Sequence, residues 1–213
     1  PYIISKPSGF KSVKNGVERF AVSTEHGEWD KAENFSLEDL RDSINEYYTE
    51  YPVCGGRSVH KMGWKVTEKF EIARDSLRKF VGAEKPSDIV FTKNATEGMN
   101  IVANGLRLKN GDHVLTSDKE HNANVVPWHH LSKYNGISYD VLAPRDNYYF
   151  DIEALKESLS SKTKLFSFVH TSNLDGYTNP AKEIIEICHD KGVKVLMDMA
   201  QSAPHKEIDV VDL

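Results

Sequence analysis

The chain lacks the features that mark membrane and secreted proteins. It contains only two cysteines, Cys54 and Cys188, in 213 residues. Two cysteines do not make a disulfide framework, which favours a reducing compartment. No uninterrupted apolar run approaches the roughly 18 residues of a membrane span. The first ten residues hold no apolar stretch of signal-peptide length. We therefore expect a cytoplasmic location and no membrane partner.

An excess of positive charge is also missing. The chain carries 27 Lys and Arg residues against 32 Asp and Glu residues, which gives a formal net charge of −5. Nucleic acids and anionic membranes are bound by a concentrated basic face, so this balance argues against both partners. The 39% of hydrophobic residues is ordinary for a globular protein, and the length fits one large domain with a small appendage.

Motifs of the common nucleotide and metal sites are absent as well. The sequence has neither the Gly-x-Gly-x-x-Gly fingerprint of dinucleotide-binding folds nor the P-loop pattern. None of its nine histidines belongs to a His-Glu-x-x-His pair, and Cys188 with His189 forms an isolated pair. The sequence therefore predicts no metal site.

Two helices are expected in the N-terminal part. The first 35 residues carry no clear hydrophobic period, whereas Ser36 begins a capping pattern for a helix that extends to Tyr51. A second helix, over 59–80, is indicated by apolar residues at spacings of three and four, and Gly82 is expected to end it. The apolar stripe consists of Val59, Met62, Val66, Phe70, Ala73, Leu77 and Phe80.

Beyond Pro86 the pattern changes to alternating strands and helices. Strands are predicted at 89–92, 113–117, 137–143, 164–171 and 193–197. Helices are predicted at 96–106, 122–134, 152–159 and 180–191. The last helix has Asn179 as its expected N-cap, Pro180 at its first position and Gly192 after its end. This alternation predicts an α/β fold with a mainly parallel sheet flanked by helices.

Polar residues follow the predicted strands, at the edge where α/β sheets bind ligands. The residues at these positions, most of them polar, are Asn94, Ala95, Thr96 and Glu97 after the first strand, Glu120, His121, Asn122 and Asn124 after the second, Ser172, Asn173, Asp175 and Gly176 after the fourth, and Asp198 and Gln201 after the fifth. Polar strand ends are common, so this pattern alone is equally consistent with a site and with an ordinary α/β domain.

Two of these positions each allow a structural and a functional interpretation. Thr96 lies at a small-residue turn into a helix, where it either caps that helix or helps to bind a phosphate group. Asp198 ends the apolar run VKVLMD, where a carboxylate needs a partner. That partner is either the protonated nitrogen of a heterocycle or the N-terminus of a neighbouring helix.

Five stretches resemble the N-terminal and central part of class V aminotransferase-fold enzymes, which bind pyridoxal 5′-phosphate (PLP). They are RSVH (57–60), FTKNATEGMNIVANGL (91–106), EHNANVVPW (120–128), HTSNLDGYTNPAKEI (170–184) and VLMDMAQSAPH (195–205). Within that family the chain is most similar to the cysteine desulfurase and selenocysteine lyase branch. The resemblance implies the large domain of the aspartate-aminotransferase type, over 51–213 and incomplete at its C-terminus, after an N-terminal segment over 1–50 with one helix.

The resemblance also implies roles for individual residues. Ala95 and Thr96 correspond to the residues around the cofactor phosphate, and His121 corresponds to a catalytic histidine that stacks on the pyridine ring. Asn173 and Gln201 resemble the side chains near the phenolic oxygen of the cofactor. Asp198, by the same resemblance, is the carboxylate that pairs with the pyridine nitrogen and keeps it protonated.

The implied reaction is the PLP-dependent release of sulfur or selenium from cysteine or selenocysteine, with alanine as the other product. Related possibilities are a class V aminotransferase, another amino-acid β-lyase, or a catalytically inactive α/β binding module. The family's Schiff-base lysine and nucleophilic cysteine are expected after Leu213, and Lys206 lies too close to Asp198 to be that lysine. The resemblance further implies an amino-acid substrate, a homodimer and a sulfur-acceptor protein as partners. One departure is Gly56, where relatives often carry a histidine.

Overall fold

A computed structural model of the chain contains two compact units. The residues it describes are 11–14, 17–20, 37–56, 59–144 and 149–213. One unit comprises Pro1–Val90 with Ala203–Asp212, and the other comprises Phe91–Ser202 with Leu213. The domain boundary that the sequence suggests near residue 50 stays a prediction.

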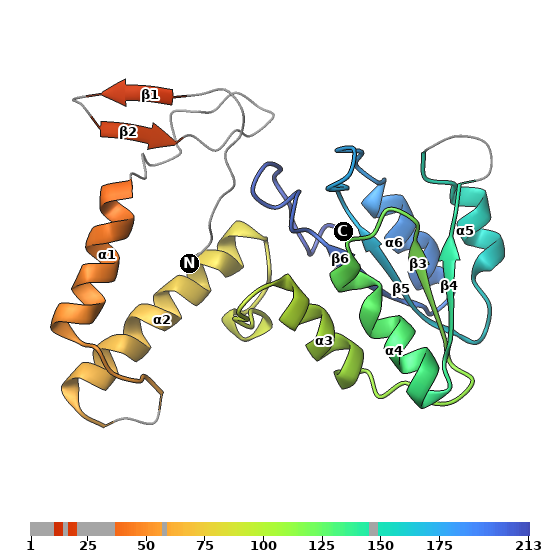
Figure 1. Ribbon diagram of the computed structural model, residues 1–213, viewed down its shortest axis with the longest axis horizontal. Helices are drawn as coiled ribbons and strands as arrows, with labels where there is room; N and C mark the ends of the chain where they lie inside the picture. Colours follow the sequence, from red (N-terminus) through yellow and green to blue (C-terminus); the bar gives the residue numbers. More distant parts are fainter. Residues whose placement is uncertain (1–10, 15–16, 21–36, 57–58, 145–148) are drawn as a thin grey trace. The chain divides into compact units, whose positions relative to one another are not determined.

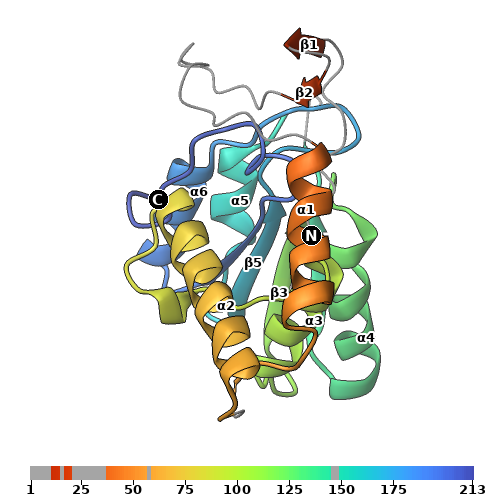
Figure 2. The ribbon, with the colours of Figure 1, turned by 90° about the vertical axis from the view of Figure 1, so that its left-hand side faces the viewer.

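The described residues of the first unit form two α-helices, a short 3₁₀ helix and a small antiparallel strand pair (Figure 1). Strands β1 (Lys11–Lys14) and β2 (Val17–Phe20) pair with each other, in a region for which the sequence showed no regular pattern. Helix α1 (Leu37–Glu50) and helix α2 (Lys61–Phe80) confirm the two predicted helices, although the expected cap Ser36 lies outside the described residues. The two helices diverge from the loop that joins them (Figure 2).

Helix α2 ends as the sequence predicted. Val81 is its C-cap, and Gly82 follows with a φ of +68°, a left-handed conformation that glycine adopts without a steric penalty. A short 3₁₀ helix, η2 (Pro86–Asp88), comes next. Gly63 is the one buried residue of α2. The apolar stripe is mostly exposed, with Phe70 at 44% and Phe80 at 57%.

The second unit contains a four-stranded parallel sheet. Its strands are β3 (His113–Ser117), β4 (Ser138–Leu142), β5 (Thr163–Val169) and β6 (Lys194–Asp198). They lie in the order β4-β3-β5-β6 and every neighbouring pair is parallel. The mainly parallel α/β sheet that the sequence predicted is thus confirmed. Strand β6 forms one edge of the described sheet.

The prediction of a strand at 89–92 is wrong. Ile89 has an extended backbone, with φ −97° and ψ 120°, as its β-branched side chain favours. A strand also requires a hydrogen-bonded neighbour, and no strand of the described sheets pairs with this segment. The local preference for extended backbone was therefore correct, whereas the tertiary pairing was not.

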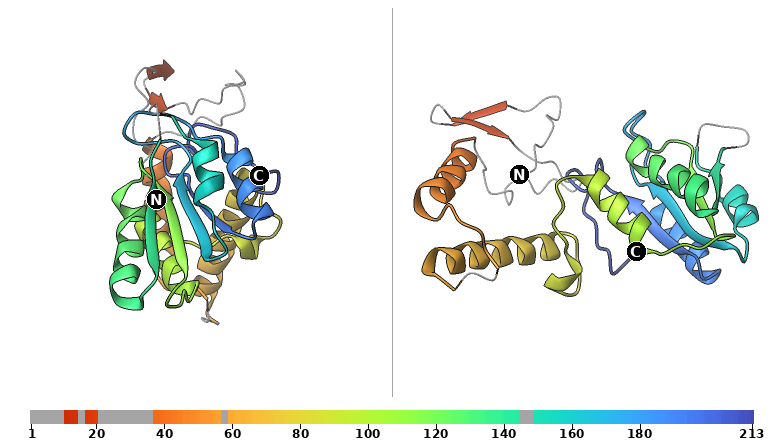
Figure 3. Two further views of the ribbon diagram at one scale, coloured as in Figure 1. Left: turned by 90° about the vertical axis from the view of Figure 1, so that its right-hand side faces the viewer. Right: turned by 60° about the horizontal axis from the view of Figure 1, so that its bottom comes forward.

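Helices cover both faces of this sheet (Figure 3). They are α3 (Ala95–Gly105), α4 (Val126–Asn135), α5 (Ile152–Ser158) and α6 (Ala181–Asp190). Side chains alternate along β5, so Leu165 packs with Trp128 of α4, while Phe166 and Phe168 pack with Ile184 of α6. The result is a three-layer α/β/α unit.

Two helix starts differ from the prediction. The helix expected over 122–134 is divided into a 3₁₀ turn, η3 (Asn122–Asn124), and α4, whose first turn contains Pro127. Proline favours the start of a helix because the missing N–H has no intrahelical partner there. Helix α6 has Pro180 rather than Asn179 as its N-cap, because the buried Asn179 side chain instead donates to the Val169 carbonyl at 2.6 Å.

Candidate functional site

Three neighbouring strands bring the predicted polar residues to one edge of the sheet. Strands β3, β5 and β6 are adjacent and parallel, so their carboxyl ends lie at the same edge. His121 follows β3, Asn173 follows β5, and Asp198 ends β6. Ligands of open α/β sheets bind at this edge, which makes it the candidate site.

Asp198 is a buried carboxylate with spare capacity for a partner. It is 5% exposed, and its Oδ1 accepts a hydrogen bond from the Ala200 N–H at 2.9 Å. Its backbone carbonyl accepts from the His170 N–H at 2.8 Å, which continues the pairing of β5 with β6. Among the described residues, no cationic side chain forms an ion pair with Asp198. A carboxylate has several acceptor sites, and the buried Asp198 accepts one backbone hydrogen bond, so it can still form a favourable interaction with a cation.

The N-terminus of α3 is open to a ligand. Asn94 is the N-cap, and its Oδ1 accepts from the Glu97 N–H at 2.9 Å. The interpretation in which Thr96 caps its own helix is therefore wrong. Ala95 and Thr96 are exposed in the first turn, where backbone N–H groups and the helix dipole favour an anion. Helix α3 packs against η3, the turn that follows His121.

The His121 ring is exposed but fixed in orientation. Its Nδ1 accepts a hydrogen bond from the Ala123 N–H at 3.1 Å, where His121 is the N-cap of η3. An accepting Nδ1 places the proton of the neutral ring on Nε2. The exposed ring can therefore donate from Nε2 and offers a surface on which a planar group can stack.

Asn173 and Gln201 lie on turns at the same edge, and both are exposed. The turn of Asn173 is closed by a bond from the Ser172 N–H to the Tyr177 carbonyl at 2.9 Å. Gln201 precedes the buried Ser202, whose hydroxyl contacts His170 Nδ1 at 3.0 Å. Within the described part of the chain, no hydrogen bond joins the Asn173 or Gln201 side chain to the other predicted site residues.

Glu120 is the centre of a hydrogen-bonded network that the sequence does not predict. Its Oε1 accepts from the Val169 N–H at 2.7 Å and from the Ser117 hydroxyl, and its Oε2 accepts from Asn124 Nδ2 at 2.6 Å. Asn124 is fully buried, and its Oδ1 in turn accepts from Trp128 Nε1 at 3.3 Å. The only sequence signal is a polar strand end with an asparagine four residues later.

Burial raises the pKa of the Glu120 carboxyl to about 7, from an ordinary value of 4.5. The negative charge of Asp198 acts in the same direction, whereas the hydrogen bonds from Ser117, Val169 and Asn124 lower the pKa. Burial is the largest of these effects, because it penalises the charged form. The Asp198 carboxylate therefore acts on the Glu120 carboxyl at one edge of the sheet.

We expect this raised pKa to make stability depend on pH. The folded state binds the Glu120 proton more tightly than the unfolded state, so the stabilisation is complete below about pH 4.5 and is lost as the pH rises through about 7. The shift corresponds to about 3 kcal/mol. Urea unfolding of wild type and Glu120→Gln from pH 5 to pH 8 measures it, since the stability of the wild type relative to the variant should fall by that order. A difference that does not change with pH would contradict the assignment.

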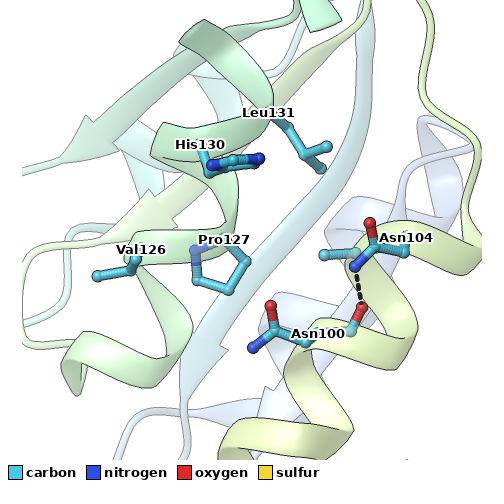
Figure 4. Close-up of a pocket in the computed structure, with 7 residues that line it drawn as sticks. Asn100, Asn104, Val126, Pro127, His130 and Leu131 are labelled. Carbon is cyan, nitrogen blue, oxygen red and sulfur yellow. Dashed lines mark hydrogen bonds between the residues drawn. The ribbon is translucent and has the colours of Figure 1, made fainter. Parts of the chain in front are cut away.

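One cavity among the described residues is lined by none of the predicted cofactor residues. This cavity of about 240 Å³ is found between α3 and α4, with Asn100 and Asn104 on one side and Val126, Pro127, His130 and Leu131 on the other (Figure 4).

In the described part of the chain, no three His, Cys, Asp or Glu side chains gather as they would around a metal ion. No described helix is both long and apolar enough to cross a membrane.

Comparison with known proteins gives one consistent result. The family model "Aminotransferase class-V" matches residues 36–213. A probable cysteine desulfurase from Synechocystis sp. is 38% identical over 172 residues, which are 79% of this chain and 41% of that protein. The chain thus spans about two-fifths of the length of that curated relative.

Solved structures agree with the sequence relatives. The apo structure of a cysteine desulfurase from Thermococcus onnurineus NA1 is 32% identical, with a TM-score of 0.75, and the match covers 82% of this chain and 44% of that one. A mutant of C-DES with glycine covalently linked to its PLP cofactor is 26% identical, with a TM-score of 0.72, over 83% of this chain and 46% of that one. The fold of the second unit is therefore that of this group of enzymes.

Proposed function

Because this chain belongs to the class V aminotransferase family, we propose that the complete protein is a PLP-dependent lyase that releases sulfur from cysteine and leaves alanine, with selenocysteine as a related substrate. The observation that carries the proposal is Asp198, a buried carboxylate at the carboxyl edge of the sheet with a single backbone donor. The relatives named cysteine desulfurase support the choice of reaction.

The residues at this edge of the sheet suit the phosphate group, the ring and the ring nitrogen of PLP. An exposed helix N-terminus with the Thr96 hydroxyl suits a phosphate group, and the buried Asp198 carboxylate suits a protonated ring nitrogen. His121 offers a ring of fixed orientation for stacking. Asn173 and Gln201 are proposed for the phenolic oxygen on the strength of the family resemblance. Bound PLP supplies an electron sink for the carbanion at the substrate α-carbon.

Cys188 is unsuited to accept sulfur from the substrate. Burial raises the pKa of the Cys188 thiol to about 12, so Cys188 carries almost no thiolate at neutral pH and is not a nucleophile. The family resemblance supports our proposal that the sulfur-accepting cysteine and the covalent lysine lie in the part of the relatives' length that this chain does not cover.

We further propose a cytoplasmic homodimer that passes sulfur to an acceptor protein. The family resemblance supports the dimer and the acceptor, and the low cysteine content supports the compartment. Large exposed apolar side chains on α2, among them Trp64 and Ile72 at 64% and 58%, are consistent with a face that another chain or segment covers.

Product analysis of the complete protein tests the proposal. With PLP and cysteine, we expect sulfide and alanine in equal amounts once a thiol reductant is added. Formation of a keto acid instead would favour the aminotransferase alternative. An absence of turnover together with an absence of PLP binding would favour an inactive α/β module and would contradict the proposal.

A further inference from the structure

Glu120 occupies a position at the sheet edge where a backbone acceptor would otherwise be needed. The last paired residues of β3 and β5 are Thr116 and Ser167. Alternate N–H groups of a strand point to opposite neighbours. His170 N–H points to β6, where it donates to Asp198, so Val169 N–H points to the β3 side. The pairing of β3 with β5 does not extend to Val169, and the Glu120 carboxyl accepts the hydrogen bond from the Val169 N–H at 2.7 Å.

This bond places Glu120 beside the predicted cofactor residues. Val169 is the register partner of Asp198, and adjacent strands lie about 4.8 Å apart. Glu120 also immediately precedes His121, and its second oxygen holds Asn124 at the end of η3, at 2.6 Å. One carboxyl group therefore ties both ends of the His121 turn to the strand that neighbours Asp198.

The network allows only one orientation of Asn124. Its Oδ1 accepts from Trp128 Nε1 at 3.3 Å and from the Ser167 hydroxyl at 2.5 Å, so its Nδ2 is the group that faces Glu120. Ser167 is fully buried, as is Asn124. Buried donors of this kind require an acceptor, and Glu120 supplies acceptors to three donors at once.

We propose that Glu120 is a positioning residue of the cofactor site, which holds the His121 ring at a fixed place relative to the Asp198 carboxylate. The inference rests on the proposed function, because the ring and the carboxylate have this relation only if they bind the same cofactor. Glu120 itself touches neither substrate nor cofactor in this assignment. It acts through the turn that carries His121.

The Glu120→Gln variant is the sharpest test, because it keeps the size of the side chain. A glutamine has one oxygen, so its NH₂ group must face either Asn124 Nδ2 or the Val169 N–H, and both are donors. We expect the complete protein to fold, to release PLP about tenfold faster than the wild type, and to show a weaker visible circular dichroism band from bound PLP. Glu153→Gln is the matched control, since that side chain is 70% exposed on α5, and we expect it to leave both readouts unchanged.

A double-mutant cycle separates positioning from general stability. In a His121→Ala background, Glu120→Gln should change PLP release by less than about twofold, because the group that Glu120 positions is gone. Unchanged release and dichroism in a folded Glu120→Gln variant would overturn the inference, as would an undiminished effect in the His121→Ala background. Wild-type protein that does not bind PLP would instead refute the proposed function.

Ser167→Ala keeps the inference testable if Glu120→Gln does not fold. This variant removes one donor to Asn124 and leaves the Glu120 carboxyl in place. We expect a smaller change of the same direction in PLP release and dichroism. A folded Ser167→Ala protein with wild-type values for both would then overturn the inference.

Discussion

Replacement of Asp198 by asparagine is expected to abolish most of the turnover of cysteine while the protein still folds. A neutral amide cannot keep the ring nitrogen of PLP protonated, so the cofactor becomes a poorer electron sink. Loss of one such electrostatic interaction typically costs on the order of 100-fold or more in rate. The fold should tolerate the change, because the asparagine Oδ1 can still accept from the Ala200 N–H, as Asp198 does at 2.9 Å.

The control for this variant is Asp190→Asn, the same chemical change at an exposed residue at the end of α6. We expect wild-type turnover and a wild-type midpoint of thermal unfolding for that variant. The contrary result for Asp198→Asn is turnover within a few-fold of the wild type together with a large loss of stability. That outcome would mean that Asp198 is a structural carboxylate.

Replacement of Trp128 by alanine should produce the largest loss of stability. Trp128 is fully buried between α4 and the sheet, where it packs with Val114, Leu131 and Leu165. Truncation of a buried tryptophan leaves a cavity and typically costs about 3–5 kcal/mol. It also removes the Nε1 donor to Asn124, so the network around Glu120 should loosen as well. Urea unfolding of the complete protein measures the loss.

Tyr134 offers a comparison on the same helix. Its side chain is 65% exposed, and Tyr134→Ala should change the free energy of unfolding by about 0.5 kcal/mol or less. Trp128→Phe keeps an aromatic ring but loses the N–H, and we expect a cost between those of the two alanine variants. Equal stability of Trp128→Ala and Tyr134→Ala would show that α4 does not pack on the sheet as described.

The parallel sheet was predictable because its strands are short apolar runs separated by residues that start and stop helices. Asp198 and His121 were candidates because each lies within a few residues of a predicted strand end, and the family resemblance implied their roles. The role of Glu120 was not predictable, since its partner Val169 is 49 positions away in the sequence. Contacts between distant parts of the chain also explain two errors of prediction. The extended segment at 89–92 has no neighbouring strand in the described sheets. The Asn179 side chain donates a hydrogen bond to β5 instead of capping α6.

The central claim is that PLP binds at the carboxyl edge of this sheet, with its phosphate group at the start of α3 and its ring nitrogen at Asp198. A crystal structure of the complete protein with PLP tests it most directly. We predict a carboxylate oxygen of Asp198 within about 3 Å of the ring nitrogen, and phosphate oxygens bonded to the Thr96 hydroxyl or to backbone N–H groups of the first turn of α3. A phosphate group bound elsewhere, or a ring nitrogen that faces a group other than Asp198, would contradict the account.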